Sequence, residues 1–184
     1  MTHLTRRHFV LAAAAIPLAA CGNGVNSNGA ATIDARVAST LSFMYDTYPG
    51  TKDLGDKAAG VLVMPLVTEA GLGLGGSFGR GALQINGSTV DYYSAASGSA
   101  GLQIGAQQYS HVLFFMTQNA LADFRSSMGW AAGADLEYVA ADQGDVLRAE
   151  TITSLAPVIA VVFAQSGLRI GATLKGTKYT RIIP

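Results

Sequence analysis

The sequence predicts an α+β domain dominated by an antiparallel, glycine-rich β-sheet, open or barrel-like, with one N-terminal helix and one mid-chain helix. Glycine makes up 22 of the 184 residues, and ten glycines fall between Gly71 and Gly105. Short apolar segments alternate with turn signals, and no helical period separates most of them. Consecutive strands without a crossover helix pair in antiparallel fashion, so the sheet is expected to be mainly antiparallel.

The two expected helices are defined by the spacing of their apolar residues. Apolar side chains at spacings of three and four predict a helix over residues 33–48, and Pro49-Gly50 ends it. The second helix covers residues 120–128, with Asn119 as the expected N-cap and Gly129 as the stop. The side chains expected on its buried face are Leu121, Phe124 and Met128.

The expected strands are apolar runs bounded by turn residues. Residues 60–66 form a continuous apolar run, and Asn86-Gly87 between two alternating segments is a strong signal for a two-residue hairpin. Ser166-Gly167 is a second hairpin signal. Strands are also expected over residues 102–117, 134–140, 155–164 and 168–182.

The composition excludes several classes of protein. Hydrophobic residues make up 49% of the chain, charged residues 13%, and the formal net charge is zero. A disordered chain needs low hydrophobicity and high net charge, and a nucleic-acid binder that works by bulk charge needs an excess of cations. One cysteine allows no internal disulfide.

The first thirty residues predict export and membrane anchoring. Residues 1–20 have a basic start and an eleven-residue apolar run, as in a signal peptide, and Arg6-Arg7 resembles a twin-arginine signal. The segment that ends at Cys21 resembles a bacterial lipobox, which predicts acylation of Cys21. Residues 21–31 are then a flexible tether and residues 32–184 the folded domain. Gly22 favours an outer-membrane lipoprotein of the cell envelope, facing the periplasm or the surface.

Few residues offer catalytic or cofactor chemistry. The pattern G-x-G-x-x-G occurs over residues 71–76, but no helix period follows to bind a pyrophosphate, so bare strand faces for close packing are the better interpretation. His111 is the one histidine after the signal and lies in an apolar run, which favours a core histidine over a catalytic base. We expect no metal and no cofactor. A glycosidase-type site made of two carboxylates is left open, because the distance between two carboxylates in the folded chain cannot be read from the sequence.

The C-terminal segment is basic. Between residues 166 and 184 there are four cations and no acid, namely Arg169, Lys175, Lys178 and Arg181. If the segment is one regular strand, three of them share a face, with Lys178 on the other. An edge strand that carries cations against aggregation and a patch for anionic lipid headgroups are both consistent with this pattern.

The longest motifs resemble one family. The run KAAGVLVMP at residues 57–65 resembles the opening of the SYLF domain, a lipid-binding and actin-regulator-associated module. The run AGLGLGGSFGRG at residues 70–81 is similar to the glycine-rich signature of that family. The resemblance continues in order to residue 182. It is carried by YYS at 92–94, GLQIGAQQY at 101–109, VLFFM at 112–116, Leu121, Phe124, Gly129-Trp130, Gly167 and GTK at 176–178.

The resemblance implies phospholipid binding. Lys57 and Arg80 match family positions beside the glycine-rich stretch and are candidate headgroup contacts. Trp130 is a candidate interfacial anchor, with a core position as the other interpretation. The helix at residues 33–48 carries Arg36 but also Asp34 and Asp46, so it does not read as a strongly cationic membrane helix.

Three functions remain open at this point. The leading hypothesis is a non-catalytic envelope lipoprotein, anchored through Cys21, whose SYLF-like domain binds phospholipid, most plausibly anionic. The second is a structural lipoprotein whose sheet packs against a protein partner. The third is a hydrolase that uses His111 or a carboxylate pair.

Overall fold

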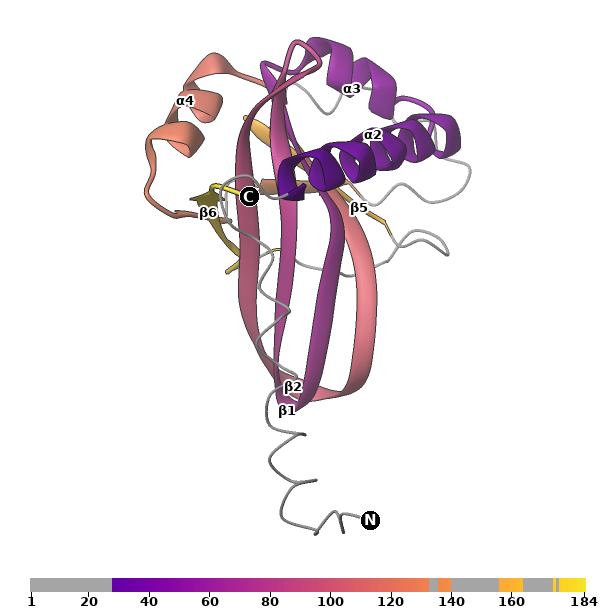
Figure 1. Ribbon diagram of the computed structural model, residues 1–184, viewed down its shortest axis with the longest axis vertical. Helices are drawn as coiled ribbons and strands as arrows, with labels where there is room; N and C mark the ends of the chain where they lie inside the picture. Colours follow the sequence, from indigo (N-terminus) through magenta and orange to yellow (C-terminus); the bar gives the residue numbers. More distant parts are fainter. Residues whose placement is uncertain (1–27, 133–135, 140–155, 164–173, 175) are drawn as a thin grey trace, which may run out of the picture.

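The computed structural model describes residues 28–132, 136–139, 156–163, 174 and 176–184. Helices α2, α3 and α4 lie at the broad end of the molecule, and two long strands, β1 and β2, extend from there to a narrow end (Figure 1). Helix α2 spans Gly29–Thr47, α3 spans Thr51–Lys57 and α4 spans Gln118–Ser126. The expected mixed fold with a mainly antiparallel sheet is confirmed.

Strands β1 (Gly60–Ile85) and β2 (Ser88–Phe115) form one long antiparallel hairpin. Their connection is the predicted two-residue turn, where Asn86 and Gly87 both have positive φ angles, of 50° and 74°. Both strands run to the narrow end, bend and return, so the hairpin is folded back on itself (Figure 1). The pairing register shifts between Leu72 and Leu74, in the glycine-rich middle of β1.

The remaining strands add to β2 at two separate places. Strand β5 (Val158–Phe163) pairs with residues 110–115, and strand β6 (Lys178–Ile182) pairs with residues 92–96, both antiparallel. Strand β3 (Trp130–Ala131) lies beside β6. Strand β4 (Leu136–Val139) lies parallel to β5, which gives an otherwise antiparallel sheet one parallel pair.

Glycines in the returning half of β1 let the two halves of that strand touch. A Cβ atom on Gly79 would lie 2.7 Å from Val67 Cγ2, and a Cβ atom on Gly81 would collide with the Val63 carbonyl oxygen. Gly79 and Gly81 therefore admit another stretch of backbone, and this backbone belongs to the same strand. The bare face expected over residues 71–76 stays a prediction.

Two apolar clusters form the core. One lies under α2, where Ile33, Val37 and Met44 pack against Val61, Phe114 and their neighbours in the sheet. The other lies under α4, where Leu121 and Phe124 pack against Leu62, Phe115 and Tyr179. These helical faces match the apolar spacing in the sequence, so burial of apolar surface explains both helix positions.

Several local predictions need correction. The N-cap of α4 is Thr117, whose hydroxyl accepts a hydrogen bond from the Ala120 amide, and the helix ends at Ser126, which leaves Met128 exposed. Helix α3 was not expected, because residues 53–56 are mostly polar. Of the expected strand over residues 168–182, the structure describes residue 174 and residues 176–182: Gly176, with a φ of 81°, lies in a turn, and β6 follows it from Lys178.

The turn of the second predicted hairpin, Ser166-Gly167, lies outside the described residues, so this hairpin stays a prediction. Within the described residues, β5 and β6 each pair with a different part of β2.

Candidate functional site

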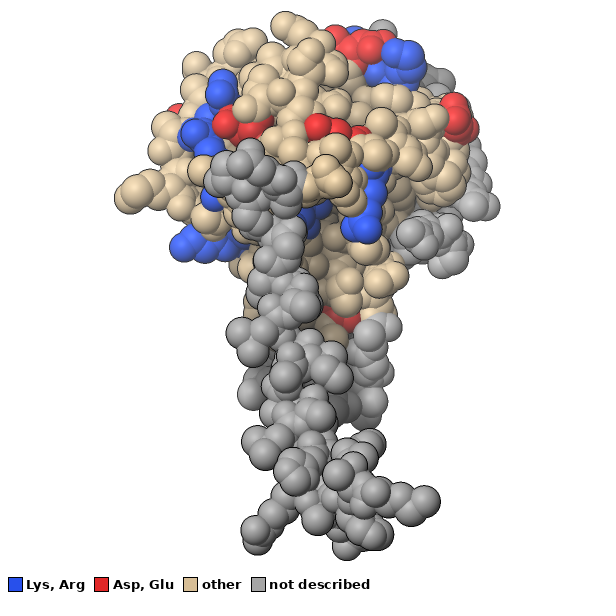
Figure 2. Space-filling model, in the orientation of Figure 1, with Lys and Arg blue, Asp and Glu red and all other residues tan. Residues whose placement is uncertain are grey.

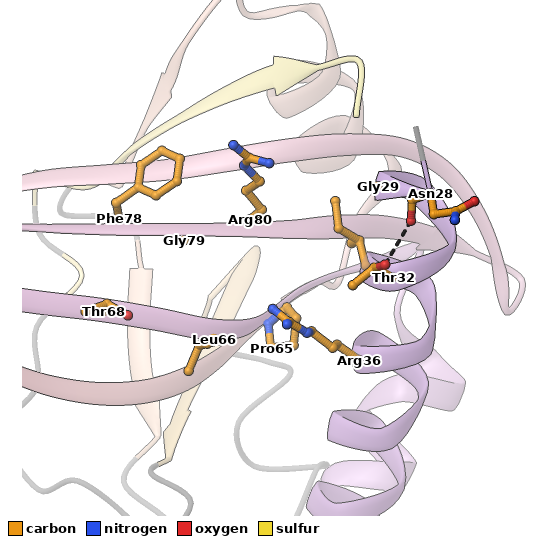
Figure 3. A pocket seen from close by; sticks show the side chains of 11 residues that line it. Asn28, Gly29, Thr32, Arg36, Pro65, Leu66, Thr68, Phe78, Gly79 and Arg80 are labelled. Atoms are coloured by element: carbon orange, nitrogen blue, oxygen red, sulfur yellow. Dashed lines mark hydrogen bonds between the residues drawn. The ribbon is translucent and has the colours of Figure 1, made fainter. Parts of the chain in front are cut away.

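A groove lies between the N-terminal half of α2 and strand β1 (Figure 3). Its volume is about 490 Å³. Side chains from two elements that are distant in the sequence line it, and the N-terminal end of α2 forms one wall. The lining residues are Asn28, Gly29, Thr32, Ile33, Arg36, Pro65, Leu66, Thr68, Phe78, Gly79 and Arg80.

An irregularity in β1 shapes the floor of this groove. The register between β1 and β2 shifts between Met64 and Val67, so Pro65 and Leu66 leave the regular ladder. Proline has no amide hydrogen to donate, which suits it to such a bulge. The buried Ser110 hydroxyl donates a 2.7 Å hydrogen bond to the Pro65 carbonyl oxygen, which fixes the bulge against β2.

Two cations face this groove from opposite walls. Arg36 extends from α2 toward Pro65, and Arg80 projects from the returning half of β1 on the same side as Phe78 (Figure 3). The Arg80 guanidinium lies 5.8 Å from the centroid of the Phe78 ring, which is 51% exposed. None of the lining residues carries a carboxylate, so the positive charge in the groove has no acidic partner among them.

Helix α2 is held in this position by an acidic residue on its other side. The Asp34 carboxylate accepts hydrogen bonds from the Thr89 and Tyr92 hydroxyls of β2, at 2.9 and 2.8 Å. Burial, and then the contact with Asp34, raise the pKa of Tyr92 above its ordinary value of 10.0. Asp34 is therefore used to fix α2 against β2.

Among the described residues, the cations outside the groove lie on several different elements. On the face shown in Figure 2, Lys and Arg side chains lie over the broad end of the molecule and alternate with acidic ones. Lys57 is exposed at the C-terminal end of α3, and Lys178 is exposed at the start of β6, where it lies over Gly129. Neither lysine lines the groove. Cys21, Arg169 and Lys175 lie outside the described residues.

Trp130 belongs to an aromatic cluster. Its ring centroid is 5.5 Å from that of Phe124 and 5.8 Å from that of Tyr179, and the side chain is half-buried. These contacts fix α4 and β3 against the core, so packing accounts for the position of Trp130.

Arg181 is held by an ion-pair network. The Asp91 carboxylate lies 3.1 Å from Arg125 Nε and 3.5 Å from Arg181 Nε, and Arg181 also donates to the Arg125 carbonyl oxygen. The Asp91 side chain is only 13% exposed. The network ties α4 and β6 to β2, so neutralising Arg181 changes the fold contacts as well as the surface charge.

We expect Asp91→Ala to lower the free energy of unfolding by about 1–2 kcal/mol, because it leaves two guanidinium groups without their shared acceptor. Urea unfolding followed by circular dichroism measures the change. Asp56→Ala is the matched control, since it removes a 3.0 Å pair with Lys52 in which both side chains are more than 60% exposed. That variant is expected to stay within about 0.5 kcal/mol of the parent. Equal losses of unfolding free energy in the two variants would contradict the role of Asp91 as the shared acceptor of Arg125 and Arg181.

His111 is a core residue, as its apolar surroundings predicted. It is fully buried, and its Nε2 shares a 2.8 Å hydrogen bond with the Tyr179 hydroxyl. Burial lowers the pKa of His111 to about 3. A ring without access to solvent cannot take a proton from a substrate, so a His111-based hydrolase is not supported.

Two further features are absent from the described residues. These residues contain no group of three or more His, Cys, Asp or Glu side chains that could hold a metal ion. None of the helices in the described part of the chain is long and apolar enough to cross a bilayer.

Comparison with known families gives one match. Residues 96–181 match the Ysc84 family, described as Las17-binding protein actin regulator, which is the SYLF domain family. A comparison with curated proteins found no match. The family match confirms the resemblance noted in the sequence over residues 96–181, and the matched family is lipid-binding and actin-regulator-like and is not a known enzyme family.

The SYLF match begins in the middle of β2. The matched segment includes Trp130, Lys178 and Arg181, whereas the groove residues Arg36 and Arg80 precede it. Because β2 is paired with β1 along nearly its whole length, the structural unit extends N-terminal to the SYLF match. Arg36 was not selected from the sequence. Its signal in the sequence, an arginine next to the buried stripe of an amphipathic helix, is too common to single out a site.

Proposed function

We propose that this protein is a non-catalytic envelope lipoprotein, anchored through Cys21, whose SYLF domain binds anionic phospholipid headgroups in the α2–β1 groove. The observation that carries the proposal is that Arg36 and Arg80 both line one groove whose lining residues include no carboxylate. The SYLF match supports lipid binding as the general activity. The anchor and the envelope location rest on the lipobox and signal-like residues of the sequence.

The chemistry of the groove suits a phosphate group. Guanidinium groups donate paired hydrogen bonds to phosphate oxygens and stay charged at all relevant pH values. A cation near an anionic membrane surface contributes about 1 kcal/mol, so the arginine pair contributes about 2 kcal/mol. The exposed Phe78 ring beside Arg80 adds an apolar contact at the interface.

The proposed anchor and the groove are compatible in distance. Asn28 lines the groove and lies seven residues after Cys21. A tether of seven residues spans at most about 25 Å. An acylated Cys21 would therefore keep the groove within about 25 Å of the bilayer surface, where headgroups are concentrated.

Vesicle co-sedimentation tests the proposal. The protein is the chain from residue 21 onward with Cys21→Ser, which retains every described element and carries no acyl group. The vesicles are pure phosphatidylcholine or a mixture with phosphatidylglycerol, at low and high salt. We expect salt-sensitive binding to the anionic vesicles, and Arg36→Gln with Arg80→Gln should weaken it about 30-fold, which corresponds to about 2 kcal/mol.

A second pair of substitutions separates the groove from the other cations. Lys52→Gln with Lys178→Gln removes the same charge from surfaces outside the groove. We expect this pair to weaken vesicle binding far less than the arginine pair. Equal loss in both pairs would mean that diffuse charge, and not the groove, binds the membrane. No binding to anionic vesicles by the parent protein would overturn the proposal.

The alternative is a lipoprotein that binds a protein partner. The family description names a Las17-binding actin regulator, which supports protein recognition within the family. In that case the parent protein would show no preference among vesicles. Crosslinking in intact cells would then give a stoichiometric adduct with an envelope protein.

A further inference from the structure

The groove that contains Arg36 and Arg80 does not end at these residues. A second cavity, of about 430 Å³, shares Arg36, Pro65 and Leu66 with it. A third, of about 210 Å³, shares Ser39, Thr40 and Pro65 with the second. Because neighbouring cavities have lining residues in common, they lie next to one another in a row along α2, and Pro65 borders all three. We call this row of cavities the α2 channel.

The two ends of the α2 channel differ in chemistry. The end near the helix start holds the two arginines. The other end is lined by Phe43 and Phe163, whose rings stack with centroids 6.0 Å apart, and by Ser39, Thr40 and Ser110. Phe43 is 41% exposed. The Ser110 hydroxyl is already used by the Pro65 carbonyl oxygen, so that end offers mainly apolar contact.

The length of the α2 channel can be estimated from the helix that borders it. Its lining runs from Asn28 to Phe43, which is fifteen residues along or beside α2 and therefore roughly 22 Å. The hydrocarbon core of a bilayer is about 30 Å thick, so one acyl chain in a leaflet extends about 15 Å. The α2 channel is long enough for one such chain together with a phosphate-bearing head.

We infer that the α2 channel binds one molecule of an anionic phospholipid with a single acyl chain. The phosphate lies between Arg36 and Arg80, and the chain follows the Pro65 floor toward Phe43 and Phe163. The inference rests on the proposed function for its cationic end and extends it from a bilayer surface to an individual lipid. Three properties of the α2 channel support this inference: a charged end, an apolar end and a length that matches one acyl chain with its head. A surface that contacts only headgroups would need neither this length nor the aromatic end.

Titration with 16-carbon lysophosphatidylglycerol, below its micelle concentration, tests the inference by isothermal calorimetry. The protein is again the chain from residue 21 onward with Cys21→Ser. We expect one lipid per protein. Lysophosphatidylcholine, with the same chain and no net charge, should bind at least tenfold more weakly, and glycerol phosphate, with no chain, should bind at least a hundredfold more weakly. Binding of several lipids per protein, or equal binding of glycerol phosphate, would overturn the inference.

A blocked channel provides the decisive variant. Thr40 lines both the second and the third cavity, so Thr40→Trp fills the path of the acyl chain without changing charge. We expect it to weaken lysophosphatidylglycerol binding at least tenfold. Ala38→Trp places the same side chain at an exposed position of α2 that lines none of the three cavities, and it should bind like the parent. Thermal melts of both variants verify that they fold.

The same variants separate this inference from the proposed function. If Thr40→Trp retains binding to anionic vesicles but loses the single-chain lipid, both statements stand. If the parent binds vesicles but not lysophosphatidylglycerol, the channel inference fails and the headgroup proposal survives. If the parent binds lysophosphatidylglycerol and ignores vesicles, the proposed membrane-surface function fails and the channel inference stands.

Discussion

Gly81→Ala is expected to lower the free energy of unfolding by about 3 kcal/mol or more, the largest effect of any substitution considered. The new Cβ would collide with the Val63 carbonyl oxygen and lie 2.6 Å from the Met64 sulfur. The carbonyl belongs to the buried first half of β1 and cannot move aside as a flexible side chain can, so the two halves of the strand must separate. Forced overpacking of this kind typically costs 1–3 kcal/mol, and more when backbone is involved.

Gly98→Ala is the matched control for this experiment. It lies in β2 of the same hairpin, and a Cβ there would meet nothing within 4 Å. Alanine at an open position also reduces the entropy of the unfolded chain, so this variant should be unchanged or slightly more stable. Urea unfolding of both variants measures the difference. If Gly81→Ala is as stable as Gly98→Ala, the close packing of the folded-back hairpin is wrong.

Acidification is expected to destabilise the protein through His111. Its pKa is about 3 when folded and about 6.5 when unfolded, so between these values the unfolded chain binds more protons. The contribution of the neutral, buried ring to stability is therefore complete above pH 6.5 and is lost as the pH falls toward 3. At pH 5 the loss is about 2 kcal/mol, at about 1.4 kcal/mol for each pH unit below 6.5.

His111→Gln isolates this effect. Glutamine keeps a polar group near the Tyr179 hydroxyl but does not titrate, so the variant is expected to be less stable at pH 8 and less sensitive to acid between pH 6.5 and pH 5. Thermal melts of both proteins from pH 8 to pH 5 measure how steeply the stability of each falls with pH. The carboxylates are the same in the two proteins and contribute equally to both dependences. Parallel curves would show that His111 is not the residue that titrates.

Local sequence signals predicted much of the fold. The amphipathic stripe of α2 and the Asn86-Gly87 turn were found because helix period and turn chemistry are properties of neighbouring residues. Thr117 was missed as a cap, because Asn119 is an equally good capping residue by type and only the backbone geometry decides between them.

The candidate site could be predicted only in part. Arg80 was selected because it lies beside the glycine-rich motif, and it does line the groove. Arg36 is 44 residues away in sequence and meets Arg80 only because α2 packs against β1 and Asp34 is held on the opposite side. The bulge at Pro65 that forms the floor depends on the pairing register with β2, which no short motif specifies.

The order in which β1 and β2 are synthesised has a consequence for assembly of this protein. The outermost pair of the hairpin, Gly60 with Phe115, joins residues 55 positions apart, so β1 is complete well before its partner exists. Until then its apolar run at residues 60–66 is an unpaired strand, which is the state most exposed to aggregation. Pairing of β2 with β1 therefore begins at the Asn86-Gly87 turn and proceeds from there toward Gly60 and Phe115. Substitutions at that turn will therefore reduce the yield of folded protein more than they reduce the stability of the molecules that do fold.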